Sequence, residues 1–400
     1  MHARRTILAV GFAFLALGTS AASAQTAAEL FDPNAVQEIR LSVNTRDLAA
    51  LRQHYQDNTY YTADLSWKNV KVRNVGIRSR GQGSRNPQKL GLRVDMARYT
   101  TGQTFVGLKA IVLDNIWQDD SFLREKLAFE LFEKMGLPVP RESFCRLYIN
   151  NDYQGLYAIT EEIDADFAKR VTGDTDGTLF EFHWFSDKQW HAEDLGAIAN
   201  YKVLLEPRTH TMDADSTLYN PIQDLFKEVN GPDDAVWRSR VEQYINLNEL
   251  MTYVGIEQFL ADNDGFLGAQ GMNNFYLYRA PGTSRHRLFV WDKDQAFQFR
   301  DSTIVPPDVN VLFRRAMTYP DLRDIYYNAL ESCARLAAAD DFLALEIDRL
   351  IGLIFDAVRS DPRKQWPEEQ RFDDAVLFLR QFASERPALV LNEVANIRRF

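Results

Sequence analysis

The sequence predicts a two-lobed α+β protein with a smaller, sheet-rich N-terminal lobe and a larger, mostly helical C-terminal lobe. Segments in the first part of the chain alternate apolar and polar residues, as half-buried strands do, and Leu90, Leu92 and Val94 are the clearest case. Later segments repeat apolar residues at three- and four-residue steps, which is the period of amphipathic helices. The chain has 400 residues, of which 46% are hydrophobic, so a sizeable core can form.

The change from one pattern to the other places a boundary between the lobes near residue 165. We expect the sheet-rich lobe to span residues 25–165 and the helix-rich lobe to span residues 166–400. The second lobe contains a hairpin segment at 262–297 that is rich in acidic and amide side chains.

The first 24 residues have the composition of a secretory signal peptide. Arg4 and Arg5 form a basic start, residues 7–17 form an apolar stretch, and residues 22–24 are small, as at a cleavage site. The apolar stretch is shorter than the ~20 residues that a membrane span needs, and no later stretch is long enough. We therefore expect an exported protein, periplasmic or secreted, with no transmembrane segment in the mature chain.

The charge and the cysteines narrow the possible partners and bonds. The formal net charge is −10, and loss of Arg4 and Arg5 with the leader would change it to −12. A charge of this sign disfavours nucleic acid and anionic membranes as partners.

Cys145 and Cys333 are the two cysteines of the sequence. They could form a disulfide in an oxidising compartment, or both could be buried thiols.

The elements of the first lobe follow from these periods and from the turn signals between them. They are a strand at 38–43, a helix starting near Thr45, strands at 70–77 and 89–95, a helix from 121 to 135, and a hairpin of 144–149 with 155–160. The second of these helices starts after a run of capping residue types, Asp119-Asp120-Ser121, and ends before Gly136.

In the second lobe a helical pattern starts at Leu247 and breaks at a strong turn signal, Asp262-Asn263-Asp264-Gly265. Two strands follow, at 275–278 and 287–291, and Pro281-Gly282 between them predicts a hairpin. Helices return at 341–359 and at 371–396, the last with a break or kink at Pro387.

Residues 76–85 lie between two predicted strands and carry three arginines and three glycines. Glycines let backbone amides approach an anion, and the arginine fork binds phosphate in bidentate fashion. The spacing is not that of a P-loop. The segment is therefore either a phosphate-binding loop or an ordinary solvated hairpin loop.

Lys89 lies on the polar face of the strand that follows. It could reach a nucleotide phosphate if a carboxylate holds it in place, or it could be an ordinary surface lysine. Glu125, Glu161 and Glu162 are the candidate carboxylates.

Polar side chains also gather at the two ends of the predicted hairpin in the second lobe. Asp264 precedes it, Asn274 stands at its start, and Asp292 and Asp294 follow its second strand. A hairpin brings its ends together, and carboxylates with an amide suit a hard cation that keeps waters for phosphate oxygens. Turn formation explains Asp264 equally well, but it explains the two acids after an apolar strand poorly.

Two other classes of function could use some of these residues. A glycosidase could use a pair of the acids, although it would need neither the Gly/Arg segment nor Lys89. The aromatic residues at 180–190 could stack sugars, form an exposed binding patch, or pack in the core.

Taken together, these motifs resemble the spore coat protein H (CotH) kinase family. The resemblance is carried by the segments Gly76–Met96, Asp119–Asp164, Ala261–Tyr278 and Val290–Phe297. It implies an atypical protein-kinase-like fold and transfer of the γ-phosphate of ATP to a protein Ser or Thr hydroxyl, with Mg²⁺ or Mn²⁺ as cofactor. The acceptor would be a protein substrate.

The resemblance also implies roles for individual residues. Lys89 would contact the phosphates as a catalytic residue, and Asp264 would orient the acceptor hydroxyl as the catalytic acid. The metal would be held by Asn274, Asp292 and Asp294. The remaining nucleotide contacts would come from Arg78, Arg80, Gly81, Gly83 and Ser84 over the phosphates and from Glu161 and Glu162 near the adenine.

The sequence departs from the kinase pattern in two respects. Asn274 lies ten positions after Asp264, against about five in the usual catalytic loop, so Asn273 is an alternative ligand. Asp262 could take the role of the base instead of Asp264.

Export would also separate the protein from cytoplasmic ATP. It could use scarce or imported nucleotide, use another phosphorylated donor, or be a non-catalytic kinase-fold module for surface binding or assembly.

Overall fold

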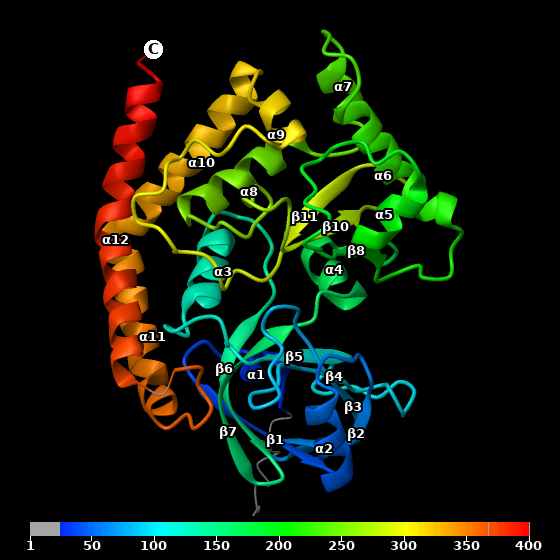
Figure 1. Cartoon of the computed structure of the whole chain (residues 1–400), viewed down its shortest axis with the longest axis vertical. Coiled ribbons are helices and arrows are strands. Elements are labelled where there is room, and N and C mark those ends of the chain that lie inside the picture. Colours follow the sequence, from blue (N-terminus) through cyan, green and yellow to red (C-terminus); the bar gives the residue numbers. More distant parts are fainter. Residues whose placement is uncertain (1–24, 367, 400) are drawn as a thin grey trace, which may run out of the picture.

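The structure is a computed structural model that describes residues 25–366 and 368–399. The predicted signal peptide at 1–24 lies outside the described residues. The predicted α+β class is confirmed: a barrel of strands forms one end of the molecule, and helices around a second, smaller sheet form the rest (Figure 1).

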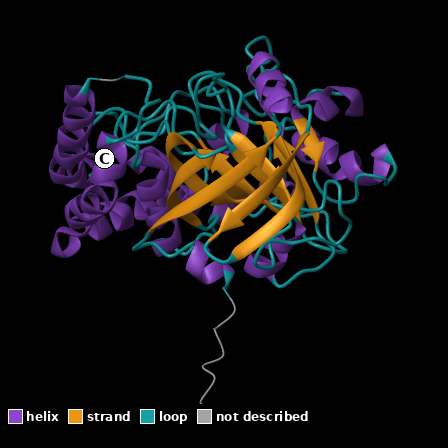
Figure 2. Ribbon diagram, turned by 90° about the horizontal axis from the view of Figure 1, so that it is seen from below, coloured by secondary structure: helices purple, strands orange, loops and turns teal. Residues whose placement is uncertain are grey.

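The N-terminal strands hydrogen-bond in the order β1-β2-β3-β4-β5-β7-β6, and parallel pairing of β6 with β1 closes them into a barrel, seen from below in Figure 2. This closure was not foreseen from the sequence. The strands are β1 (Val36–Val43), β2 (Tyr61–Trp67), β3 (Val70–Ser79), β4 (Leu92–Asp95), β5 (Ala110–Asp114), β6 (Glu142–Ile149) and β7 (Asp152–Glu161), with the short helices α1 (Ala27–Leu30) and α2 (Thr45–Gln53).

Alternation along the strands fills the barrel with apolar side chains. Leu65, Ile77 and Leu92 are fully buried in one cluster, and Trp67 packs edge-on against Phe105 with ring centroids 5.8 Å apart. Residues on the opposite face of the same strands point outward from the barrel, to solvent or, as for Val112, to the helical region.

Helix α3 (Arg124–Lys134) connects β5 to β6 and packs into the core of the helical region. Its Phe132 ring lies 5.3 Å from the ring of Tyr253. Val112 on the outer face of β5 is buried in a cluster with Phe289 and Trp291 of the second sheet. The barrel therefore contacts the rest of the protein through α3 and β5.

The second sheet has the strand order β11-β10-β8-β9. The elements of this region are α4 (Ala165–Thr172), β8 (Thr178–Phe182), α5 (Ile198–Leu204), β9 (Leu205–Pro207), α6 (Asp215–Val229), α7 (Trp237–Val241), α8 (Leu247–Phe259), β10 (Phe275–Arg279), β11 (His286–Val290), α9 (Val311–Ala316), α10 (Pro320–Ala338), η1 (Ala339–Asp341), α11 (Phe342–Arg359) and α12 (Glu369–Ile397).

The last two helices, α11 and α12, lie side by side along one flank of the molecule, and the turn between them reaches the barrel at β6 and β7 (Figure 1). In this turn Ser360 accepts a hydrogen bond from Arg146, while Tyr153 donates one to the Ala357 carbonyl. Helix α12 runs through Pro387 without the predicted break.

The structure also answers two questions that the sequence raised, on the cysteines and on membrane-spanning helices. Cys145 is buried in the barrel core and Cys333 in the helical core, and both are free thiols, so the disulfide alternative is wrong. Over the described part of the chain, no helix combines the length and the hydropathy that crossing a bilayer requires.

Candidate active site

The β10–β11 hairpin brings the predicted acids together, as the sequence suggested. The loop from the end of α8 leads into β10, and β11 pairs with β10 along its length, with Phe275 opposite Val290. Asn274 and Asp292 flank this pair and both have left-handed backbones, with φ of 57° and 49°. Such residues are held in place by their surroundings and are common at functional sites.

Lys293 fixes the two ends of the hairpin to each other. Its fully buried ammonium lies 2.7 Å from Glu257 Oε1 on α8 and 3.0 Å from Asp262 Oδ2 in the loop. It also donates to the Asn274 carbonyl at 3.4 Å. Asp262 is thereby committed to a buried ion pair, and it is not available as the base that the sequence left open.

Asp264 is held by two amides. Its Oδ1 accepts a hydrogen bond from Asn273 Nδ2 at 3.0 Å, and its Oδ2 accepts one from Asn274 Nδ2 at 2.9 Å. Burial raises the pKa of this carboxyl, and the bonds from the two amides oppose that rise. Both amide oxygens remain as candidate metal ligands, so the geometry does not separate Asn273 from Asn274.

Asp292 is half-buried and makes no side-chain hydrogen bond or ion pair with the residues that the structure describes. Burial and the negative charge of Asp114 raise the pKa of Asp292 to about 7, although Arg80 acts in the opposite direction. A half-buried carboxylate that is close to other acids and forms no ion pair is expected where a cation binds.

The three arginines of the Gly/Arg segment differ in what they contact. Arg85 donates to the Gly81 and Gln56 carbonyls, and Arg78 donates to Asn58 and to the Ser79 carbonyl, so both hold the loop itself together.

Arg80 instead stacks its guanidinium 4.5 Å from the ring centroid of Trp291, the residue before Asp292. Within the described residues its side chain has no hydrogen-bond or ion-pair partner. A half-buried guanidinium with unused donors beside Asp292 is suited to a phosphate group.

A family model described as CotH kinase protein matches residues 77–390, which is most of the chain. This chain belongs to the CotH kinase protein family. The resemblance seen in the sequence is thereby confirmed, and the matched range contains the arginine, lysine and acidic residues of the site.

Two curated relatives of this CotH protein differ in how much they cover. Inner spore coat protein H of Bacillus subtilis (strain 168) is 23% identical over 349 residues, which cover 84% of this chain and 91% of that protein. Invasin CotH3 of Rhizopus delemar is 24% identical over 190 residues, which cover 46% of this chain and 30% of that protein.

A solved structure, that of the Helicobacter pylori proinflammatory kinase CtkA, matches 77% of this CotH protein and 95% of its own chain at 11% identity. Its TM-score is 0.30, which is too low to carry an argument about fold or activity.

Lys89 of the CotH protein has a partner that the sequence did not suggest. Its ammonium is fully buried and lies 2.8 Å from Asp361 Oδ2, between the rings of Phe122 and Tyr157. Burial lowers the pKa of Lys89, and Asp361 opposes that effect. The expectation that Glu125, Glu161 or Glu162 pairs with Lys89 is wrong.

Two of those glutamates, Glu161 and Glu162, form ion pairs with arginines instead. Glu161 forms ion pairs with two arginines, Arg141 at 2.7 Å and Arg170 at 2.6 Å. Glu162 is bound by Arg93 and Arg208, each at 3.0 Å, which lower its pKa although burial alone would raise it. The strand end predicted to hold adenine is thus lined by ion pairs, although the buried Glu162 Oε2 atom has no hydrogen-bond partner there.

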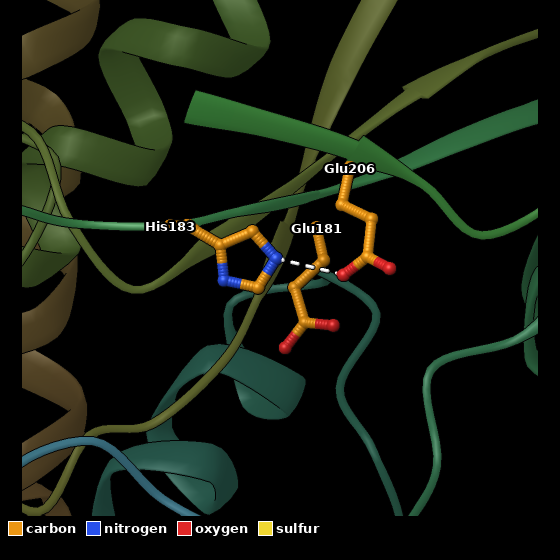
Figure 3. A group of neighbouring side chains, drawn as sticks. All are labelled: Glu181, His183 and Glu206. Carbon is orange, nitrogen blue, oxygen red and sulfur yellow. Dashed lines mark hydrogen bonds and ion pairs between the residues drawn. The ribbon is translucent and has the colours of Figure 1, made fainter. Parts of the chain in front are cut away.

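One further polar group in this CotH protein was missed by sequence reasoning. Glu181, His183 and Glu206 bring their ligating atoms within 4.8 Å of one another, and His183 bonds to Glu206 at 2.9 Å (Figure 3). The Arg208 guanidinium lies 3.5 Å from Glu181 and 3.8 Å from Glu206 and already supplies positive charge. We therefore interpret the group as an ion-pair network. Its residues follow no short motif that the sequence could have revealed.

Proposed function

We propose that this CotH protein is a metal-dependent phosphotransferase with an atypical kinase-like arrangement of two lobes. It would transfer the γ-phosphate of ATP to a Ser or Thr hydroxyl of a protein substrate. The observation that carries the proposal is that Asp264 and Asp292 lie close enough at one end of the β10–β11 hairpin for their charges to interact, with the Arg80 guanidinium over Trp291 and without an ion-pair partner among the described residues. We further propose that the protein is exported, on the basis of its leader sequence.

The donor set fits a hard divalent cation. Asp292 and Asp294 offer carboxylate oxygens, and Asn273 or Asn274 offers an amide oxygen, which are the ligands that Mg²⁺ and Mn²⁺ take. When bound, the ion would neutralise charge on the phosphate oxygens. Among the described residues Asp292 forms no ion pair, although the charges of Arg80 and Lys293 act on it, and a carboxylate left unpaired in this way is suited to be such a ligand.

The roles of the side chains follow from their surroundings. Asp264, fixed by two amides, would orient the acceptor hydroxyl and accept its proton as the hydroxyl oxygen bonds to the γ-phosphorus. The bond from that phosphorus to the β,γ-bridging oxygen breaks, and ADP leaves. Arg80 would neutralise charge on the phosphates during the transfer.

The buried aromatic residues disfavour the two alternatives. A sugar-binding groove or an adhesive patch needs exposed rings, but Phe180, Phe182 and Trp190 are at most 7% exposed. Phe182 stacks on Phe275 with centroids 4.7 Å apart, inside the helical core. These three residues serve packing. Phe185 is the exposed ring of the cluster, at 36%, and a single exposed ring gives a glycosidase or an aromatic binding module little support.

The test is a thermal-shift titration of the mature protein with ATP, with and without Mg²⁺ or Mn²⁺, followed by transfer of labelled phosphate to a mixture of candidate acceptor proteins. A ligand at a hundredfold excess over its Kd stabilises the folded state by about 2.7 kcal/mol. Asp292→Ala should lose the metal-dependent shift. Asp264→Asn should keep it while transfer falls by roughly 10²- to 10⁴-fold.

Asp374→Ala, an exposed acid on α12, is the control and should behave as the unaltered protein. A shift of equal size in Asp292→Ala would overturn the metal assignment. If no nucleotide or other phosphorylated donor shifts the unaltered protein, the phosphotransferase proposal fails.

A further inference from the structure

The segment between β8 and α5, residues 183–197, touches both halves of the proposed site through one residue. The Trp184 carbonyl accepts a hydrogen bond from Gln82 Nε2 at 2.7 Å, and the Trp184 indole donates one from Nε1 to the Gln270 carbonyl at 2.9 Å. Gln82 belongs to the Gly/Arg segment, two residues after Arg80, whereas Gln270 lies in the loop between α8 and β10. Trp184 therefore contacts a loop of the barrel and a loop of the helical region at once.

The loop that receives the indole hydrogen bond is the one that carries Asp264. It folds back on itself, because the Ala269 amide donates to the Asn263 carbonyl at 3.2 Å. The Asn273 amide likewise donates to the Gly265 carbonyl at 3.1 Å. Both neighbours of Asp264 in the sequence are thus bonded to the part of the loop that Trp184 holds, so a shift of that part would move the Asp264 carboxylate.

The segment is attached to this loop more firmly than to the barrel. The Trp190 carbonyl accepts a hydrogen bond from the Met272 amide at 2.8 Å, and the Trp190 ring is 3% exposed. A Cβ added at Gly271 would lie 2.7 Å from the Trp190 nitrogen, so the two backbones pack closely. The bond from Gln82 is by contrast exposed, and such a bond shifts an equilibrium by roughly two- to tenfold. The contact with the barrel is therefore the one that opens first.

On the barrel side this bond holds a short flap, residues 81–84. The flap is anchored at both ends, since the Arg80 amide donates to the Gly91 carbonyl at 2.9 Å and the Arg85 guanidinium donates to the Gln56 carbonyl at 2.6 Å. Gln82 in its middle is exposed. The flap follows directly after Arg80, the residue assigned to the phosphates, so its position decides how open the phosphate site is.

We propose that Trp184 is a positioning residue for the transfer reaction, which holds the flap closed with its carbonyl and holds the Asp264 loop with its indole. This inference rests on the phosphotransferase function proposed above. Nucleotide enters and ADP leaves when the bond between Gln82 and Trp184 opens, and closing of the flap excludes water from the phosphates. Because the two contacts use different atoms of Trp184, two substitutions can separate them.

The first experiment removes the contact with the flap. Binding of a fluorescent ATP analogue with Mg²⁺ is followed by stopped-flow mixing with the mature protein. Since the flap must open for entry and for exit, Gln82→Ala should raise both rate constants roughly two- to tenfold and change Kd by less than about twofold. Gln88→Ala is the matched control and should behave as the unaltered protein. It alters an exposed glutamine of the same loop whose side chain makes no hydrogen bond with the described residues.

The second experiment removes the contact with the Asp264 loop. Trp184→Phe keeps the carbonyl that Gln82 reaches and an aromatic ring, but it loses the Nε1 donor. Initial rates of labelled-phosphate transfer to the mixture of candidate acceptors should show kcat lower by roughly tenfold and KM for ATP within about twofold of the unaltered value. Trp366→Phe, at an indole that is 40% exposed, is the control and should leave both constants unchanged.

Each result decides between the two proposals. Unchanged rate constants in Gln82→Ala, or unchanged kcat in Trp184→Phe, would overturn the role of Trp184 while the phosphotransferase stands. Faster dissociation alone, with a weaker Kd, would also overturn it and make Gln82 a direct phosphate contact. If Trp184→Phe does not fold, or if nucleotide binds and no acceptor is labelled, the rate constants of the exposed Gln82→Ala variant decide. If no nucleotide binds the unaltered protein, the proposed function fails and this inference fails with it.

Discussion

Lys89 and Asp361 form a buried ion pair across 272 positions of the sequence, with 2.8 Å between Nζ and Oδ2. Both side chains are at most 1% exposed. Asp361 also accepts hydrogen bonds from the backbone amides of Leu156 and Arg363. The turn between α11 and α12 is thereby bound to Lys89, in the loop between the Gly/Arg segment and β4, and to β7, so the C-terminal helices hold the end of the proposed phosphate-binding loop.

Asp361→Ala should strongly destabilise the protein. Removing one partner leaves the Lys89 ammonium buried without a counter-charge, which typically costs about 3–5 kcal/mol. Urea unfolding followed by circular dichroism measures this loss. Asp356→Ala, an exposed acid one turn earlier on α11, should change the free energy of unfolding by less than about 0.5 kcal/mol. Equal effects of the two substitutions would mean that the ion pair contributes nothing to stability.

Gly155→Ala should displace the Asp361 carboxylate from its place against β7. Gly155 has φ of +118°, and a Cβ built there would lie 2.2 Å from Asp361 Oδ1. Gly136→Ala is the control because φ is +82° there and nothing lies within 4 Å of the added atom. The control should lose about 1–2 kcal/mol from backbone strain alone. Gly155→Ala should lower the free energy of unfolding by about 1–3 kcal/mol more than the control does, because the added methyl group overpacks the site. Equal unfolding midpoints for Gly155→Ala and Gly136→Ala would contradict the close approach of Asp361 to Gly155.

Arg80→Ala should weaken nucleotide binding without unfolding the protein. If the guanidinium donates to a phosphate, its loss removes about 1.5–3 kcal/mol, or roughly ten- to a hundredfold in Kd. Arg80→Lys should recover only part of the affinity, since it keeps the charge but loses the fork and the stacking on Trp291. Isothermal titration with an ATP analogue and Mg²⁺ gives both values.

Arg85→Ala is the comparison for this prediction, because Arg85 bonds to backbone carbonyls of its own loop and of the loop before it. It should lower the melting temperature more than Arg80→Ala does. An unchanged Kd in Arg80→Ala would remove Arg80 from the site.

His286 should make the protein less stable in acid. The ring is 1% exposed, and burial lowers its pKa from 6.5 to about 3, with Arg279 acting in the same direction and the Tyr244 carbonyl opposing it. Between these two values the unfolded chain binds the proton and the folded protein does not, so stability is present above pH 6.5 and falls as the pH is lowered. The contribution lost by pH 5 is about 2 kcal/mol.

His286→Leu should remove this dependence. The difference in unfolding free energy between pH 8 and pH 5 should be about 2 kcal/mol smaller in the variant than in the unaltered protein. His54→Leu, at an exposed position, should leave the difference unchanged. An identical pH dependence in His286→Leu would show that the imidazole is protonated in the folded state.

Much of the local structure could be predicted from the sequence, because it depends on which face of a segment is buried. The alternation around Leu92 predicted β4, although the strand starts at Leu92 and leaves Lys89 buried in the loop before it. The three- and four-residue steps from Leu247 predicted α8, and the turn at Pro281-Gly282 predicted the hairpin. The hairpin in turn brings Asp292 near Asp264, since pairing of two adjacent strands brings their ends together. The family could likewise be inferred from these motifs.

Only the tertiary structure decided which distant charges meet. The sequence offered three glutamates for Lys89, yet Asp361 pairs with it because the α11–α12 turn docks on the barrel. Closure of the barrel depends on the parallel pairing of β6 with β1, which no local period encodes. A periodic pattern indicates which face of one segment is buried, but not which other segment covers that face. The choice of partner between distant segments depends on how whole elements pack, and packing arises only when the complete chain folds.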